Sequence, residues 1–235
     1  MERLTSREIL SKDVRRNHRF MLNIRCGDGI MIVILDYDMG NVGSIQNILN
    51  KIGQKDVLIS RETDAIDKAD KLVLPGVGAF DTGMNNLKKY NLVEPIIDFV
   101  QNKKKPLLGI CLGMQLLGRG SEEGSEKGLG LIPFDNIRFQ LDHNYKIPHM
   151  GWNYIEIVNK NIPIVKNLEQ RQRYYFVHSY HAKCDNVDNI LMTCEYGYSF
   201  AAAVVKEKVY GVQFHPEKSH QFGMLLLKNF VEECS

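Results

Sequence analysis

The sequence predicts an α/β domain built around a mainly parallel sheet, followed by a β-rich half that is more antiparallel. In the first half of the 235-residue chain, short apolar runs alternate with segments whose apolar residues recur at helical spacing. That alternation is typical of buried parallel strands joined by helices. In the second half, short runs with period-two alternation follow one another, which indicates antiparallel strands at one edge of the same sheet.

The regular pattern of the first half begins at Met31. MIVILDY reads as a buried strand, and Val42, Ile45 and Leu49 then lie on one helical face before Gly53 ends the helix. The expected strands of this half are 31–37, 56–60, 68–76 and 105–110. The expected helices are 39–53, 81–90 and 92–104.

The second half is expected to add short strands and one closing helix. The strand-like runs cover residues 134–141, 154–159, 174–184, 189–196 and 200–214. Residues 220–234 carry apolar side chains at helical spacing and form the expected last helix.

Composition and charge exclude several classes of protein. The net charge of +2 is too small to indicate binding to nucleic acid or to a membrane surface, and no apolar run is long enough to span a bilayer. The five cysteines are scattered and the sequence start lacks a secretory apolar core, so we expect free thiols and a cytoplasmic location. Residues 1–30 are basic with little strand pattern, so we expect a disordered or loosely docked extension before a domain over 31–235.

One cysteine lies at an unusual junction. In LLGICLGMQLL, residues 107–117, Cys111 stands between Gly109 and Gly113 where strand-like sequence changes to helix-like sequence. This is the G-x-nucleophile-x-G elbow pattern, with cysteine in place of serine. The N–H groups at the helix start would stabilise a thiolate, and the Leu112 N–H would face an oxyanion. The alternative is that Cys111 is a small buried core residue.

A histidine near the end of the chain is the expected base. His215 follows the run VYGVQF and Glu217 comes two residues later, so both side chains lie on one side of an extended segment. A carboxylate that accepts from one ring nitrogen orients the other nitrogen toward the thiol. No metal site is predicted, because His215, Glu217 and His220 fit no ligand spacing, and His178 and His181 are expected on opposite faces of one strand.

A second glycine-rich turn occurs in LVLPGVGAF, residues 72–80. Gly76 and Gly78 permit a positive φ or a peptide flip, so the Val77 N–H can turn inward. Together with the Leu112 N–H it would form a two-donor oxyanion hole. The turn contains neither G-K-[ST] nor G-x-G-x-x-G, which excludes a phosphate-binding loop.

These motifs together resemble a known family. GICLGMQ, the PGVG turn and the late HPE are similar to class I, triad-type glutamine amidotransferases. PGVGAF, SEEG, GLGLI, PHMGWN, YFVHSY and QFHPEKS resemble the glutaminase subunits of imidazole glycerol phosphate synthases, from about Met31 to the C-terminus. The resemblance implies a flavodoxin-like fold and cofactor-free hydrolysis of glutamine to glutamate and ammonia. Cys111 would form the thioester, His215 would move the proton, and Glu217 would orient His215.

The same resemblance implies binding roles. The residues expected to contact glutamine are Gly78, Gln115, Glu123, Ser179 and Tyr180. The residues expected to face the partner are Asn41, Trp152 and Lys218. The implied partner is a (β/α)8-barrel synthase subunit of histidine biosynthesis, which receives the ammonia through an internal channel.

Other functions remain open at this point. AFDTGM also occurs in relatives that supply ammonia to enzymes modifying surface-polysaccharide sugars, so the partner has an alternative. A cysteine hydrolase or peptidase acting alone would use the same elbow. A flavodoxin-like binding module would contain the same turn with an inert cysteine.

Overall fold

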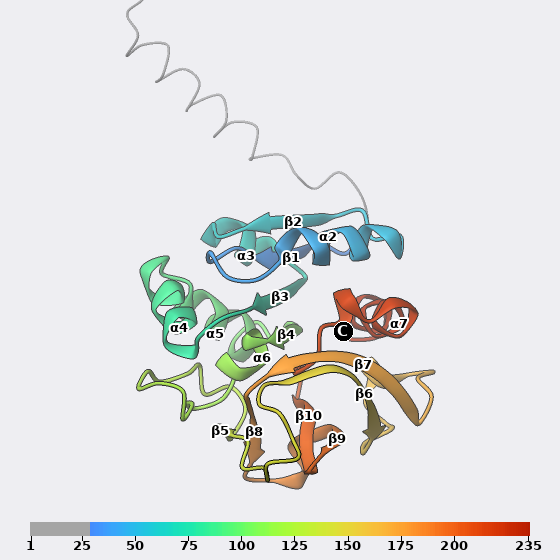
Figure 1. Ribbon diagram of the computed structural model, residues 1–235. Helices are drawn as coiled ribbons and strands as arrows, with labels where there is room; N and C mark the ends of the chain where they lie inside the picture. The colour runs from blue at the N-terminus through green and yellow to red at the C-terminus, as the bar shows by residue number, and fades with distance from the viewer. Residues whose placement is uncertain (1–28) are drawn as a thin grey trace, which may run out of the picture.

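The computed structural model describes residues 29–235, so the extension expected over 1–30 lies almost wholly outside the described residues. The parallel part of the sheet is shown in Figure 1. In spatial order it consists of β2 (Val57–Ser60), β1 (Ile32–Leu35), β3 (Lys71–Gly76), β4 (Leu107–Cys111) and β11 (Val209–Val212). Every residue of β1, β3, β4 and β11 is buried, as expected for parallel strands covered on both faces.

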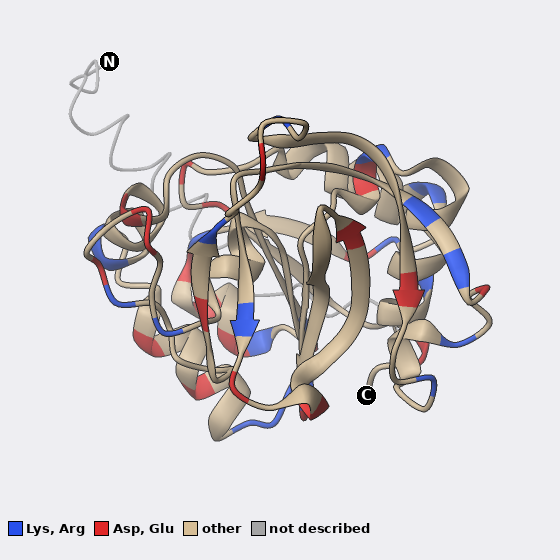
Figure 2. Cartoon of the chain, turned by 60° about the horizontal axis from the view of Figure 1, so that its bottom comes forward, with Lys and Arg blue, Asp and Glu red and all other residues tan. Residues whose placement is uncertain are grey.

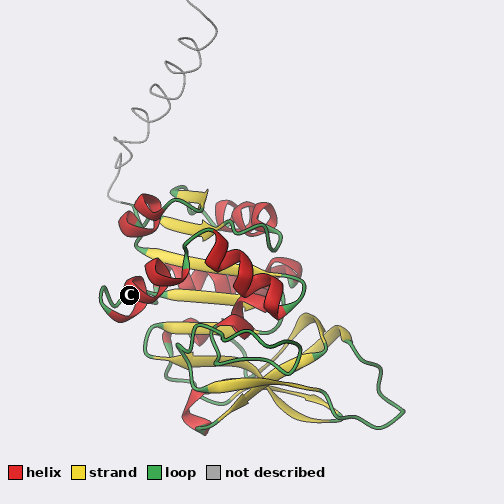
Figure 3. Ribbon diagram, turned by 90° about the vertical axis from the view of Figure 1, so that its left-hand side faces the viewer, coloured by secondary structure: helices red, strands yellow, loops and turns green. Residues whose placement is uncertain are grey.

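Helices cover both faces of these strands (Figure 3). One face is covered by α2 (Val42–Lys51) and α7 (His220–Glu232). The other is covered by α3 (Thr63–Lys68), α4 (Phe80–Lys89), α5 (Val93–Gln101) and α6 (Leu112–Leu116). Strand alternation divides the core: Ile32 and Ile34 pack on the α2 side, whereas Val33 and Leu35 pack on the α4 side.

The sheet continues from β11 into an antiparallel section. Its main path is β10 (Tyr198–Lys206), β9 (Ile190–Tyr196), β6 (His149–Ile157) and β7 (Arg171–His178). A side branch consists of β8 (Tyr180–Cys184), which pairs with β10, and β5 (Phe134–Arg138), which pairs with β8. Short 3-10 turns occur at η2 (Pro163–Val165), η3 (Val187–Asn189) and η4 (Pro216–Lys218).

Several expected elements differ from the structure. The run expected over 174–184 is two strands, β7 and β8, separated at Ser179. The run over 200–214 is a hairpin whose second strand, β11, lies parallel to β4 in the centre of the sheet. Helix α3 was not expected, because its six residues are too few for a clear helical period.

The break at Ser179 overturns one expectation. His178 and His181 do not lie on opposite faces of one strand, because each belongs to a different strand. Both rings instead pack against Phe139, with ring centroids 5.1 Å and 4.7 Å from it.

The described residues also show how the cysteines and the charged side chains are distributed. Four cysteines described there are free, namely Cys111, Cys184, Cys194 and Cys234. Basic and acidic residues are interspersed along the chain in the view of Figure 2. Among residues 29–235, no helix is both long and apolar enough to cross a membrane.

Candidate active site

The carboxyl ends of the parallel strands bring the predicted site together. β3, β4 and β11 run side by side in the same direction, so the segments after Gly76, Cys111 and Val212 leave the sheet at one edge. Ligand sites of α/β sheets lie at this edge. The glycine turn, the elbow and the segment leading to His215 are therefore neighbours although far apart in sequence.

Cys111 occupies a sharp turn between β4 and α6. Its φ of 54° and ψ of −111° are strained for a residue with a side chain, and the residue is 7% exposed. The flanking glycines permit the turn. A Cβ at Gly113 would lie 1.8 Å from the Leu74 carbonyl oxygen, and a Cβ at Gly109 would lie 2.7 Å from that of Gly113. The elbow therefore requires glycine at both positions, and the structure confirms the predicted strand–turn–helix geometry.

His215 and Glu217 form a buried pair after β11. Nδ1 of His215 lies 2.7 Å from Oε1 of Glu217, and both side chains are almost inaccessible to solvent. Since a carboxylate only accepts hydrogen bonds, Nδ1 carries a proton and donates it, which leaves Nε2 to face another partner. The His215 backbone N–H donates to the Tyr175 carbonyl, at 2.9 Å, and this bond holds the segment against β7.

The electrostatics link this pair to the thiol. Burial lowers the pKa of His215, but its interactions with Cys111 and with the Glu217 carboxylate outweigh burial and raise the pKa to about 9. Nε2 of His215 is buried without a hydrogen-bond partner of ordinary geometry. The sulfur is thus close enough to influence the ring without a well-aligned hydrogen bond, and such loose geometry is common in unliganded enzymes.

The glycine turn lies directly beside the elbow. Gly76 is paired in register with Cys111, and a Cβ on Gly76 would lie 2.9 Å from the Cβ of Leu112. Gly78 has φ +109°, a conformation that only glycine adopts readily. Val77, between them, is 46% exposed. The oxyanion-hole role of the Val77 and Leu112 N–H groups stays a prediction.

Gln115 connects the elbow helix to β8 and to a residue that the sequence did not single out. Its Nε2 donates to the Tyr180 carbonyl and to Oε1 of Gln213, both at 3.2 Å. The Gln213 side chain is fully buried, and its Nε2 lies 3.9 Å from the Cys111 sulfur. Gln213 precedes His215 by two residues, so the period-two spacing that linked His215 to Glu217 was the available signal for it.

Other predicted binding residues lie around this centre. The exposed Glu123 accepts a hydrogen bond from the Phe80 N–H, at 2.8 Å, and so lies beside the first turn of α4, directly after the glycine turn. The half-buried Ser179 lies between β7 and β8, and its carbonyl accepts from the Phe139 N–H, at 3.1 Å.

The three residues predicted to face the partner lie in different surroundings. Trp152 is 41% exposed on β6 and stacks on His220 with ring centroids 5.3 Å apart. The Lys218 ammonium lies 5.7 Å from the centre of the Tyr175 ring, on the strand paired with β6. Asn41 begins α2, where its Oδ1 accepts from the Ser44 N–H at 3.2 Å. Asn41 thus has a capping role that its helix position explains without a partner.

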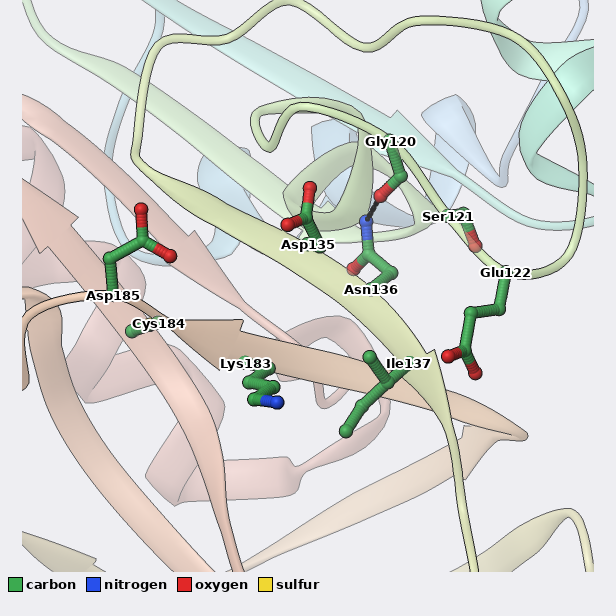
Figure 4. A pocket seen from close by; sticks show the side chains of 9 residues that line it. All are labelled: Gly120, Ser121, Glu122, Asp135, Asn136, Ile137, Lys183, Cys184 and Asp185. Atoms are coloured by element: carbon green, nitrogen blue, oxygen red, sulfur yellow. Dashed lines mark hydrogen bonds between the residues drawn. The ribbon is translucent and has the colours of Figure 1, made fainter.

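A pocket of about 660 Å³ opens beside β5 and β8, and none of Cys111, His215 and Glu217 lines it (Figure 4). Its lining residues are Gly120, Ser121, Glu122, Asp135, Asn136, Ile137, Lys183, Cys184 and Asp185. One of them, the fully buried Asn136, donates to the Gln115 carbonyl, at 2.9 Å, and so supports the elbow helix. In the described part of the chain, no group of three or more His, Cys, Asp or Glu side chains could hold a metal ion.

Comparisons with known proteins agree with the fold and the motifs. Residues 33–234 match the family described as glutamine amidotransferase class-I. The chain is 54% identical to imidazole glycerol phosphate synthase subunit HisH 2 of Methanococcus maripaludis, over 87% of this chain and 100% of that protein. It is 49% identical to the subunit of the same name from Pseudomonas aeruginosa, over 86% of this chain and 99% of that protein.

Solved structures support the fold. PurLQS from Thermotoga maritima superposes with a TM-score of 0.66 at 16% identity, over 86% of this chain and 97% of that chain. A glutamine amidotransferase from Thermotoga maritima gives a TM-score of 0.55 at 19% identity, over 88% and 82%. The chain therefore belongs to the class I glutamine amidotransferase family and, within it, to the group of HisH subunits.

Proposed function

We propose that this chain is the glutaminase subunit of an imidazole glycerol phosphate synthase, which hydrolyses glutamine and delivers the ammonia to a synthase subunit in histidine biosynthesis. One observation carries the catalytic part of the proposal. A cysteine held at positive φ between a strand and a helix lies beside a buried histidine that is hydrogen-bonded to a buried carboxylate. That arrangement is suited to nucleophilic catalysis by a thiolate.

The reaction proceeds in two halves at one sulfur. Nε2 of His215 accepts the Cys111 proton, and the thiolate attacks the side-chain amide carbon of glutamine. The carbon–nitrogen bond breaks as the imidazolium returns the proton to the departing nitrogen, so ammonia leaves and a thioester remains. Water, deprotonated by His215, then attacks the thioester, and glutamate is released as the sulfur regains its proton. Glu217 stabilises the imidazolium in both halves.

Backbone N–H groups would stabilise the negative oxygen formed in each half. We assign this role to Val77 and Leu112, since the glycine turn lies beside Cys111 and next to Leu112, the first residue of α6. The substrate amino acid would lie against residues of four segments around the elbow. We assign these contacts to Gly78, Gln115, Glu123, Ser179 and Tyr180.

We place the surface that binds the partner on the exposed face of β6. Met150, Trp152 and Tyr154 alternate along that strand with exposures of 62%, 41% and 48%. Exposed aromatic side chains grouped on one face are typical of protein interfaces. With Lys218 and Asn41, they would contact a barrel-shaped synthase subunit close to the site of ammonia release. We also propose a cytoplasmic location, consistent with the free thiols.

The sugar-modifying partner is less well supported, because both relatives reported above are named as subunits of imidazole glycerol phosphate synthase. A genetic test separates the two partners. The chain, expressed in a histidine auxotroph that lacks its own glutaminase subunit together with the synthase subunit from the native source, should restore growth without histidine. Cys111→Ala should not restore growth. Failure of the wild-type chain, with co-purification of a sugar-modifying enzyme from the native source, would reject the histidine assignment.

A further inference from the structure

Two buried histidines outside the triad form a hydrogen-bonded pair between neighbouring strands. His149 of β6 and His178 of β7 stand opposite each other in register. Nδ1 of His149 lies 3.0 Å from Nε2 of His178. On the far side of each ring there is one more polar contact: His178 Nδ1 lies 2.8 Å from the Tyr180 carbonyl oxygen, and His149 Nε2 lies 3.3 Å from the Asn153 amide nitrogen.

These contacts permit one arrangement of protons. A carbonyl oxygen only accepts, so His178 carries its proton on Nδ1 and presents a bare Nε2. His149 must then donate from Nδ1, and its bare Nε2 accepts from the Asn153 amide. The amide orientation of Asn153 is fixed because its nitrogen donates to the Glu195 carbonyl and its oxygen accepts from the Tyr154 N–H, both at 2.8 Å. The pair therefore donates in one direction, toward Tyr180.

The direction of donation continues as far as the nucleophile. The Tyr180 carbonyl oxygen accepts a second hydrogen bond from Nε2 of Gln115, at 3.2 Å. The same amide nitrogen donates to Oε1 of Gln213, which turns the Gln213 amide nitrogen toward the Cys111 sulfur, at 3.9 Å. The carbonyl is thus the point at which the histidine pair and the two glutamine side chains meet.

We propose that His149 and His178 are positioning residues of the glutamine site. As neutral Nδ1–H tautomers they hold the Tyr180 carbonyl in one orientation, and the carbonyl in turn holds the amides of Gln115 and Gln213 beside the sulfur. That this site binds glutamine rests on the proposed function, whereas the tautomers and the direction of the hydrogen bonds do not.

The surroundings of the pair favour a neutral, fixed arrangement. Phe176 stacks on His149 with centroids 4.9 Å apart, and Phe139 and Phe200 lie 5.1 Å and 5.2 Å from His178. Apolar rings provide no competing hydrogen-bond partner, so neither imidazole gains by turning over. Burial also lowers the pKa of His149 to about 4 and that of His178 to about 3, so both rings stay uncharged near neutral pH.

The tautomers can be measured without turnover. Long-range proton–nitrogen NMR of the full chain, labelled with ¹⁵N, distinguishes the two ring nitrogens of each histidine, and signals are assigned by loss in His149→Phe and His178→Phe. We expect both rings to be Nδ1–H tautomers at pH 7. An Nε2–H tautomer or an imidazolium at either position would overturn the proposal.

Isosteric variants test the positioning role. Asparagine places an amide near the Nδ1 position of a histidine, whereas glutamine places it near Nε2. His178→Asn should therefore keep the donor to Tyr180 and a KM for glutamine within about twofold of wild type. His178→Gln and His178→Phe should raise KM about tenfold, as expected for one lost buried hydrogen bond, with a smaller effect on kcat. His181→Gln, at a buried histidine outside this pair, is the matched control and should leave KM unchanged.

If His178 has a purely structural role, the three variants should rank in the opposite order. If His178 only filled space among aromatic rings, phenylalanine would be tolerated best and asparagine worst, and that order would overturn the proposal. Alkylation of Cys111 by iodoacetamide, which needs no glutamine site, should proceed at the wild-type rate in the control His181→Gln. If wild-type protein released no ammonia from glutamine with its synthase subunit present, the proposed function would fail, and the NMR result would still decide the tautomers and the direction of donation.

Discussion

Acidification should destabilise this protein through the buried histidine pair. His149 and His178 are 3% and 5% exposed, and burial lowers the pKa of His149 to about 4 and that of His178 to about 3. In the unfolded chain a histidine has a pKa of about 6.5. As the pH falls, the unfolded chain therefore binds protons before the folded chain does. The contribution of the two histidines to the free energy of unfolding is complete above about pH 6.5. It is lost as the pH falls toward their pKa values in the folded protein.

The size of the effect follows from these pKa values. Between pH 7 and pH 5, each of the two histidines takes up most of one proton in the unfolded chain and almost none in the folded chain. Each therefore lowers the free energy of unfolding by about 2 kcal/mol over this interval, and the pair lowers it by about 4 kcal/mol. That is a large part of the roughly 5–15 kcal/mol that stabilises a typical domain.

Urea unfolding at pH 7 and pH 5 measures this loss. The difference between the two pH values should be about 2 kcal/mol smaller in His178→Phe than in wild type. Any effect of the substitution on the free energy of unfolding that does not depend on pH cancels, because each protein is compared with itself at the two pH values. His143→Phe, at an exposed position, is the control and should show the wild-type difference. An equal pH-dependent loss in wild type and His178→Phe would refute the assignment of a neutral buried ring.

Four further substitutions test other parts of the structure. Gly113→Ala should abolish ammonia release or soluble expression, because its Cβ would lie 1.8 Å from a backbone oxygen. Gly43→Ala in α2 is the control: there is open space around its Cβ position, so it should raise the urea midpoint slightly. Glu217→Gln replaces a charge-assisted hydrogen bond with a neutral one, so it should lower kcat/KM for glutamine about 10- to 100-fold. It should also lower the pKa of His215 measured by NMR. Unchanged kinetics would show that Glu217 does not assist His215. Trp152→Ala should weaken binding of the synthase subunit by about 2 kcal/mol in calorimetry and leave alkylation of the thiol unchanged, and equal affinity would remove it from the interface.

Features encoded in short stretches could be predicted from the sequence. The elbow depends on residues 109–113, and its glycines, its cysteine and the preceding apolar run are all visible there. His215 and Glu217 are two residues apart, so their common side needs only an extended segment. The parallel strands were identifiable because a strand buried on both faces is apolar throughout.

Features that depend on contacts between distant segments could not be predicted in the same way. The histidine pair joins β6 and β7, and its register is visible only after the strands have paired. The break at Ser179 interrupts no apolar pattern, so residues 174–184 read as one strand. The contact of Glu123 with the Phe80 N–H spans 43 positions and depends on how a loop passes over α4.

Modification by an electrophilic glutamine analogue tests the nucleophile most directly. The chain, with its synthase subunit present, is incubated with the analogue and digested, and the adduct is located by mass spectrometry among the five cysteines. A single adduct on Cys111, lost in His215→Ala, is the expected result. An adduct on another cysteine, or none on Cys111 while iodoacetamide still modifies it, would contradict a thiolate that attacks glutamine with His215 as its base.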